Sequence, residues 1–155
     1  MKILFVCSGN TCRSPLAEAL ARKVAIERGL VHVEIASAGT SAGHGSGASD
    51  GALLVGLERN MDLSQHRSQP LTAALVAAND LMLGMSDAHV AQAEQLGGRG
   101  RSYLLSDYAT QGVLRAGVID PFGGELETYR ATADELEKYV RSALDRAVAQ
   151  GTPNR

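Results

Sequence analysis

The stretch that decides the fold is KILFVCSGNTCRSP, residues 2–15. It begins with an apolar run, Ile3 to Val6, whose residue types favour a β-strand. Ser14 and Pro15 then open a pattern that is typical of a helix start. A strand, a tight loop at residues 7–13 and a helix start therefore follow one another in one short segment. We expect the loop to curl at the N-terminus of the helix.

Such a loop can bind an anion. The first amides of a helix lack intrahelical partners, and the helix dipole adds partial positive charge there. Gly9 and Asn10 both tolerate the positive φ values that converging amides require. Arg13 adds a planar, charged fork suited to two phosphate oxygens. Cys7, at the end of the strand, would face the anion, and the same field favours its nucleophilic thiolate form.

Each of these residues also has a purely structural interpretation. Taken alone, a cysteine followed six positions later by an arginine favours a buried strand end and a surface helix residue. Ser14 could be a simple helix cap, or its hydroxyl could donate to the Cys7 thiolate. The β-run before the loop, the Gly9-Asn10 pair and the helix start after it together favour the phosphate-binding interpretation.

Length and composition place further limits on the protein. A chain of 155 residues predicts one domain, 1–155, and 45% hydrophobic residues with 21% charged residues are typical of a globular protein. The net charge of −2 favours neither nucleic acid nor an anionic membrane as a partner. No apolar run approaches the ~20 residues that span a bilayer. Met1-Lys2 leads directly into a strand, so we expect no signal peptide and a cytoplasmic location.

The two cysteines, Cys7 and Cys12, are too few for a secreted disulfide scaffold, which again favours a reducing cytoplasm. They could simply be free thiols, or they could form a reversible disulfide under oxidation, since an exposed thiolate oxidises first. A structural zinc site needs four ligands in recognisable pairs. The histidines show no such spacing, so we expect no metal and no cofactor; they are His32, His44, His66 and His89.

Hydrophobic periodicity predicts the remaining elements. A helix of about fifteen residues should follow Ser14 and end at Gly29, and the alternating segment 31–35 should be the second strand. Strand, helix and strand make a βαβ unit and so imply a parallel sheet. Further helices are expected at 48–59, 71–78, 86–98 and 127–150, and strands at 80–85 and 102–105. Segments 37–50 and 107–119 are expected to be irregular, 120–124 to be a turn, and 151–155 to be frayed.

Four blocks in this order resemble the low-molecular-weight protein tyrosine phosphatases. They are CSGNTCRSPLAEA at 7–19, SAGT at 37–40, His66 before a basic residue, and DPFGG at 120–124. The resemblance runs the length of the chain. It implies an α/β, flavodoxin-like fold with a four-stranded parallel sheet, helices on both faces and a phosphate-binding loop after the first strand. It also implies metal-independent hydrolysis of phosphorylated protein substrates through a phosphocysteine, with inorganic phosphate as product.

The resemblance also implies roles for individual residues. Cys7 would attack phosphorus, Arg13 and the loop amides would hold the transferring group, and Asp120 would protonate the leaving group. The phosphate-binding loop would consist of Ser8, Gly9, Asn10, Thr11, Cys12 and Arg13. A supporting hydrogen-bond network would contain Asn10, Ser14, Ser37 and His66. The structural alternative for Asp120 is a turn-forming residue before proline.

Two positions bear on the phosphoryl group. Thr11 stands where tyrosine-specific members commonly carry a bulky apolar residue, and only Phe122 is aromatic in the DPFGG block. Thr11, DPFGG and the following ELETYRATADELEKYV resemble the bacterial protein-arginine phosphatases of the family. A threonine hydroxyl suits a polar guanidinium group. We therefore expect phosphoarginine as the substrate, with phosphotyrosine as the alternative.

Two other functions compete with hydrolysis. Arsenate reductases resemble this fold and loop, but their redox relay needs further cysteines after the third strand, and this chain has none beyond Cys12. A module that only binds phosphate would need neither a nucleophile nor an acid, whereas Cys7, Arg13 and Asp120 are all present. The sequence therefore favours a phosphatase.

Overall fold

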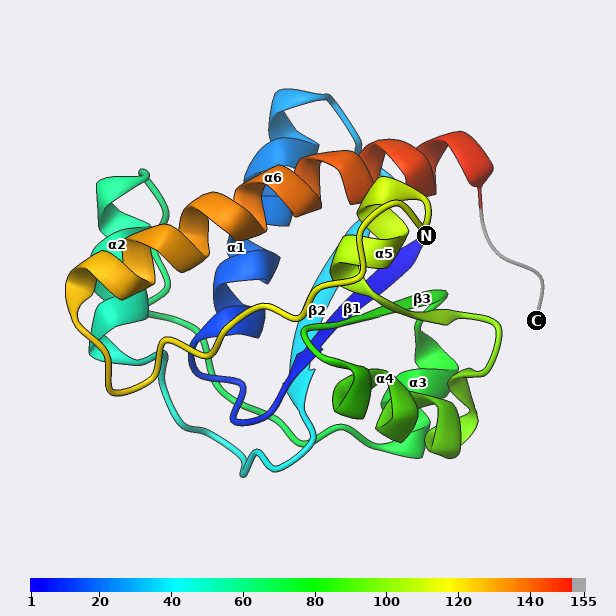
Figure 1. Ribbon diagram of the computed structural model, residues 1–155, viewed down its shortest axis with the longest axis horizontal. Coiled ribbons are helices and arrows are strands. Elements are labelled where there is room, and N and C mark those ends of the chain that lie inside the picture. Colours follow the sequence, from blue (N-terminus) through cyan, green and yellow to red (C-terminus); the bar gives the residue numbers. More distant parts are fainter. Residues whose placement is uncertain (152–155) are drawn as a thin grey trace.

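The computed structural model describes residues 1–151, and it forms a four-stranded sheet between two layers of helices (Figure 1). The first βαβ unit consists of β1 (Lys2–Cys7), α1 (Arg13–Glu27) and β2 (Glu34–Gly39). The other elements are α2 (Asp50–Glu58), α3 (Ala73–Ala78), β3 (Leu81–Gly84), α4 (Asp87–Ala93), a π-helical turn η1 (Glu94–Gly98), β4 (Ser102–Leu104), α5 (Leu105–Thr110) and α6 (Leu126–Gln150).

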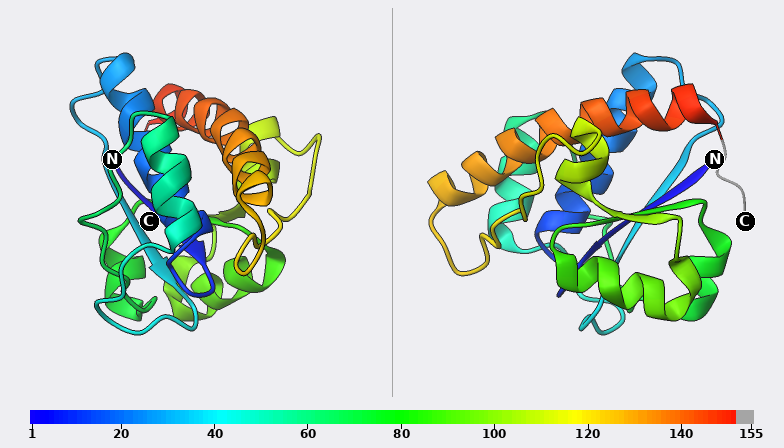
Figure 2. Two further views of the ribbon diagram at one scale, coloured as in Figure 1. Left: turned by 90° about the vertical axis from the view of Figure 1, so that its left-hand side faces the viewer. Right: turned by 45° about the vertical axis from the view of Figure 1, so that its right-hand side comes forward.

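All neighbouring strands are parallel, in the order β2-β1-β3-β4. Because side chains alternate along β1, Ile3 and Phe5 face one helical layer while Leu4 and Val6 face the other. Helices α1, α5 and α6 lie on the first side of the sheet, where α2 packs against α1 and α6, and α3 and α4 lie on the second side, as Figure 2 shows from two directions. The predicted fold class is confirmed.

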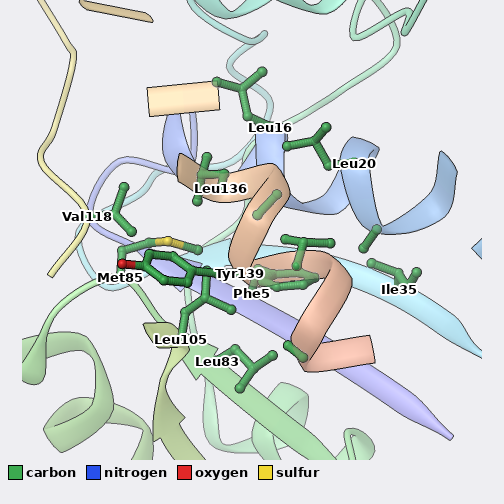
Figure 3. Packing of buried hydrophobic residues seen from close by; sticks show 14 of the residues in the cluster. Phe5, Leu16, Leu20, Ile35, Leu83, Met85, Leu105, Val118, Leu136 and Tyr139 are labelled. Atoms are coloured by element: carbon green, nitrogen blue, oxygen red, sulfur yellow. The ribbon is translucent and has the colours of Figure 1, made fainter. Parts of the chain in front are cut away.

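The larger core lies between β1 and the C-terminal helix. Phe5 is fully buried there beside Leu83, Leu105 and Tyr139 (Figure 3). Helix α6 buries residues at helical spacing, among them Leu136, Val140 and Leu144, which is why its predicted range is confirmed to within a residue.

Two predicted segments need correction. The second strand was predicted at 31–35, but β2 begins at Glu34 and continues through Ser37 to Gly39, inside the segment expected to be irregular. Gly29 lies at a φ of 65° and Val31 is 82% exposed, so this part of the alternating pattern is turn rather than sheet. The strand instead continues to Gly39, which pairs with Cys7 at the end of β1.

Residues 107–119 were predicted to be irregular, yet their first residues belong to helix α5. Leu105 and Tyr108 are buried one helical turn apart, and the helix packs on α6. A six-residue helix shows too little periodicity to be recognised in the sequence, so contact with α6 decides its structure. Of the segment 151–155, which was predicted to be frayed, residues 152–155 lie outside the described residues.

Among residues 1–151, no helix combines the length and the apolar character that crossing a bilayer would require.

The fold brings three strand ends to one edge of the sheet. Cys7 pairs with Gly39 of β2, and the preceding Val6 pairs with Gly84 of β3. Ligands of open parallel sheets bind beyond this carboxyl edge. Chain segments that follow β1, β2 and β3 therefore meet around Cys7.

Candidate active site

The loop between β1 and α1 presents free amides. Within the described chain, the amides of residues 8–13 donate no hydrogen bond to another protein group, and no side chain caps α1. Asn10 takes the left-handed conformation, with a φ of 56°, whereas Gly9 does not. The loop therefore has the open donors and the left-handed residue that an anion-binding nest needs.

The end of β2 supports this loop from one side. The amides of Thr40 and Ser41 donate to the carbonyls of Cys7 and Ser8 at 2.9 and 3.0 Å. A Cβ on Gly39 would lie 2.4 Å from the Ser8 carbonyl oxygen, so only glycine permits this approach. The SAGT block thus acts as a backbone support beneath the loop.

Arg13 is placed to bind an anion. Its side chain is buried, with the residue only 7% exposed, and Nη1 donates to the Val118 carbonyl at 2.9 Å. Nη2 lies 3.7 Å from Asp120 Oδ2. Nε is buried without a hydrogen-bond partner in the described structure. An unsatisfied donor on a buried cation is costly unless a ligand accepts from it.

A cavity of about 200 Å³ joins the predicted catalytic and selectivity residues. Its lining consists of Cys7, Gly9, Thr11, Cys12, Arg13, Asp120 and Phe122. A larger cavity of about 630 Å³ lies beside Glu18, Ser37 and His66, but neither cysteine nor Arg13 lines it. The predicted catalytic residues therefore line the smaller cavity.

Asp120 lies on the far wall of that cavity. Its side chain is 51% exposed and pairs with Arg13, while Oδ1 accepts from the Phe122 amide at 3.1 Å. The same carboxylate therefore bonds within the turn and belongs to the lining of the cavity. Phe122, which also lines the cavity, is 70% exposed.

The four predicted supporting residues form one network. Asn10 Oδ1 accepts from the Gln69 amide at 3.0 Å, which fixes the orientation of the side-chain amide. Nδ2 then donates to Ser14 Oγ at 2.8 Å and to Ser37 Oγ at 2.9 Å. His66 Nε2 donates to the Asn10 carbonyl at 2.7 Å.

This bonding pattern leaves the hydrogen of the Ser14 hydroxyl free. Ser14 Oγ accepts from Asn10 and lies 2.8 Å from Cys7 Sγ. Its own hydrogen is therefore available to the Cys7 sulfur, which favours a negative charge there. Of the two sequence interpretations of Ser14, the structure supports donation to sulfur, since Ser14 does not cap α1.

Glu18 completes the network and was missed in the sequence. Its Oε1 accepts from Ser37 Oγ at 2.7 Å, and its Oε2 pairs with Arg22 at 3.0 Å. Because Ser37 gives its only hydrogen to Glu18, it must accept from Asn10. The available signal was a carboxylate between Ala17 and Ala19 on the helix that follows the loop.

Cys12 has a separate environment, also missed in the sequence. Its sulfur lies 3.2 Å from Ser49 Oγ and 3.5 Å from Tyr129 OH. Burial chiefly raises the pKa of Tyr129, and the Cys12 contact acts in the same direction. The Ser49 amide also donates to the Thr11 carbonyl at 2.9 Å, so α2 holds this side of the loop. Both cysteines are free thiols.

Fold and site together define an α/β protein with an anion-binding loop around a buried cysteine. The chain belongs to the family described as low molecular weight phosphotyrosine protein phosphatase, whose model matches residues 2–152.

Its relatives include proteins named for two activities. A protein-arginine-phosphatase of Bacillus subtilis (strain 168) is 41% identical over 143 residues, which is 91% of this chain and 93% of that protein. The low molecular weight protein-tyrosine-phosphatase PtpB of Staphylococcus haemolyticus (strain JCSC1435) is 38% identical, covering 88% of this chain and 92% of that protein.

A solved structure shares the fold closely. It is a cysteine-to-serine mutant of the YwlE arginine phosphatase with a phosphorylated active-site serine. It is 39% identical to this chain, covers 94% of each chain and has a TM-score of 0.87.

Proposed function

We propose that the protein hydrolyses phosphorylated side chains through a phosphocysteine on Cys7. One observation carries this proposal: Cys7 shares a cavity with Arg13 and Asp120, beside a loop of free amides. The Cys7 thiolate attacks phosphorus, the bond to the leaving group breaks, and Asp120 gives its proton to the leaving atom. Water then attacks the phosphocysteine, Asp120 takes a proton from it, and inorganic phosphate leaves as the S–P bond breaks.

The other loop groups stabilise the transferring phosphoryl group. Arg13 supplies a cationic fork with a free Nε, and the amides of residues 8–13 supply further donors. Phosphoryl transfer depends chiefly on such positioning and charge stabilisation. Ser14 donates to sulfur and so stabilises it as the leaving group in the second step. This scheme uses only side chains and water, without a metal or cofactor.

Phosphoarginine is the substrate that we propose. Thr11 places a hydroxyl on the cavity wall, and Phe122 is the aromatic residue that lines the cavity in the described chain. A guanidinium group can bond to a hydroxyl, and a site built on such a bond discriminates strongly. A relative named protein-arginine-phosphatase supports this choice. Phosphotyrosine is the second candidate, because Phe122 could stack on a phenol ring and PtpB is named for that activity.

Matched peptides with phosphoarginine or phosphotyrosine test the choice. We expect kcat/KM to favour phosphoarginine, Cys7→Ser to abolish release from both, and Thr11→Ile to shift the ratio toward phosphotyrosine. A clear excess on phosphotyrosine would show that Phe122 suffices as an aromatic wall. Release from neither peptide by the folded protein would overturn the phosphatase proposal itself.

Partners and location are proposed on the same basis. Phosphorylated proteins are the substrates, inorganic phosphate is the product, and neither nucleic acid nor a membrane is a partner. The net charge of −2 supports the exclusion of polyanions. Two free thiols at the site support a reducing bacterial cytoplasm as the location.

We further propose that Cys7 and Cys12 form a reversible redox pair. Peroxide oxidises the Cys7 thiolate to a sulfenic acid, and the Cys12 sulfur displaces water from it to form a disulfide. Both cysteines are among the residues that line the same cavity. We expect peroxide to inactivate the enzyme, thiol to restore it, and Cys12→Ser to recover less. Equal recovery of both proteins would contradict the pairing.

A further inference from the structure

One buried histidine lies against the phosphate loop without a role in the scheme above. His89, on α4, is only 4% exposed. Its Nε2 lies 2.9 Å from Ser8 Oγ, and its Nδ1 lies 3.0 Å from Ser86 Oγ. Ser8 is the first residue of the loop, and Ser86 follows β3. The ring therefore bridges two neighbouring strand ends.

Gly84 at the end of β3 allows the helix that carries His89 to lie close to the strand. A Cβ on Gly84 would lie 3.1 Å from the Cβ of His89 and 3.0 Å from Cγ2 of Val90. Glycine at this position lets α4 pack tightly on the end of β3. The Gly84 partner on β1 is Val6, directly before Cys7. His89 is thus anchored to the strand that pairs with the nucleophile strand.

The charge state of the ring fits a hydrogen-bonding role. Burial chiefly lowers the pKa of His89 to about 4, Arg13 acts in the same direction, and Asp120 opposes them. The ring is therefore neutral near pH 7, with one donor and one acceptor nitrogen. Two serine hydroxyls satisfy both nitrogens whichever tautomer is present.

Ser8 is consequently held from two sides. The Ser41 amide fixes its carbonyl from the β2 side at 3.0 Å, and His89 fixes its hydroxyl from the β3 side. Its amide is among those that donate to no described protein group.

We propose that His89 is a positioning residue of the active site, which ties Ser8 to Ser86 and so fixes the first loop amide for phosphate binding. The inference rests on the proposed phosphatase function. A histidine with a purely structural role in the core would also be buried and hydrogen-bonded. The positioning role is therefore distinguished from the structural role by the effect of substitution on phosphate binding, not by its effect on stability.

The test compares wild type, His89→Phe, Ser8→Ala and the double variant with p-nitrophenyl phosphate as substrate. This small aryl phosphate makes the result independent of a preference for phosphoarginine or phosphotyrosine. We expect His89→Phe to lower kcat/KM about tenfold and to raise the Ki of inorganic phosphate similarly, as for one lost hydrogen bond. The double variant should lose no more than either single variant, because both break the same contact.

Val90→Ala is the matched control, since it loosens the same helix on Gly84 but keeps the ring. It should lower Tm while kcat/KM stays within about twofold. Wild-type kcat/KM in folded His89→Phe, additive losses in the double variant, or an equal loss in Val90→Ala would overturn the proposal. Should His89→Phe fail to fold, Ser8→Ala and His89→Gln give the same comparison, with Gln expected to retain part of the activity.

A second readout separates failure of this inference from failure of the phosphatase proposal. Inorganic phosphate should protect Cys7 from iodoacetamide in wild type and protect it less in His89→Phe. This measurement needs no turnover. Equal protection in both proteins would contradict the positioning role even in an enzyme with a different substrate.

Discussion

The two halves of the active site are built differently. The phosphate loop buries Asn10, Cys12 and Arg13 and is hydrogen-bonded to three other parts of the chain. Its partners are Ser37 in β2, Ser41 after β2, and Ser49 at the start of α2. The segment that carries Asp120 is exposed on the far wall, and its Asp120 side chain makes one turn bond and one ion pair. The nucleophile half is therefore held rigidly, whereas the acid half has few contacts that fix it.

Arg13 connects the two halves. It belongs to the loop, yet its Nη1 holds the buried Val118 carbonyl, two residues before Asp120. A segment anchored at one point and exposed beyond it has low local stability. We therefore expect the acid half to adjust when substrate enters, while the phosphate loop keeps its shape. Substitutions in the two halves should accordingly have different signatures.

The largest expected effect is on activity alone. Asp120→Asn should lower kcat by about 100- to 1,000-fold on phosphotyrosine peptide, because phenoxide is a poor leaving group that needs a proton. The free energy of unfolding should change by less than about 0.5 kcal/mol, since the side chain is half exposed. Steady-state kinetics and urea denaturation measure the two quantities.

A substrate with a better leaving group tests whether Asp120 acts as an acid. The loss in Asp120→Asn should be smaller on p-nitrophenyl phosphate than on the peptide, because nitrophenoxide leaves more readily without a proton. An equal loss on both substrates would show that Asp120 positions Arg13 through their ion pair rather than acting as an acid.

Asn10→Ala should have the opposite signature, with stability and activity lost together. It removes the hydrogen bonds that Asn10 makes with the Gln69 amide and with the Ser14 and Ser37 hydroxyls, and it places alanine at a φ of 56°. We expect unfolding to become easier by about 2–3 kcal/mol. Asn60→Ala is the matched control, because Asn60 has a φ of 62° but is exposed. It should cost about 1 kcal/mol, and an equal cost at both positions would contradict the network's contribution.

Residue patterns alone predicted what is local, whereas the distant site residues Ser37, His66 and Asp120 were predicted only through the family resemblance. Residues 2–15 contain strand, loop and helix start in one window, so the phosphate loop could be derived from them. The partners of the loop come from far along the chain: His89 lies 81 residues from Ser8, and Tyr129 lies 117 residues from Cys12. No periodicity in one sequence indicates such pairs. Glu18 is nearer, but an acidic residue on a helix is ordinarily a surface residue.

Short segments whose residues show no clear helical or strand periodicity of buried positions were also predicted poorly. Helix α5 has six residues and depends on its packing against α6. The start of β2 was misplaced because Val31 and Val33 alternate like a strand although the chain turns there. In both places tertiary contacts, rather than local preference, decide the structure.

The smallest expected effect concerns pH and again separates the two halves. The pKa of His89 is lowered to about 4 in the folded protein, mainly by burial, from its ordinary value of 6.5. Between these values the unfolded chain binds more protons, so stability falls as pH falls from 6.5 toward 4. Wild type should lose about 1–2 kcal/mol more than His89→Gln between pH 7 and pH 5, measured by urea denaturation. Other titrating groups, including Arg13 and Asp120, whose charges act on the ring, are common to both proteins. Parallel stability curves would mean that His89 accepts a proton in the folded state, and that the β3 side of the phosphate loop is less rigid than its hydrogen bonds indicate.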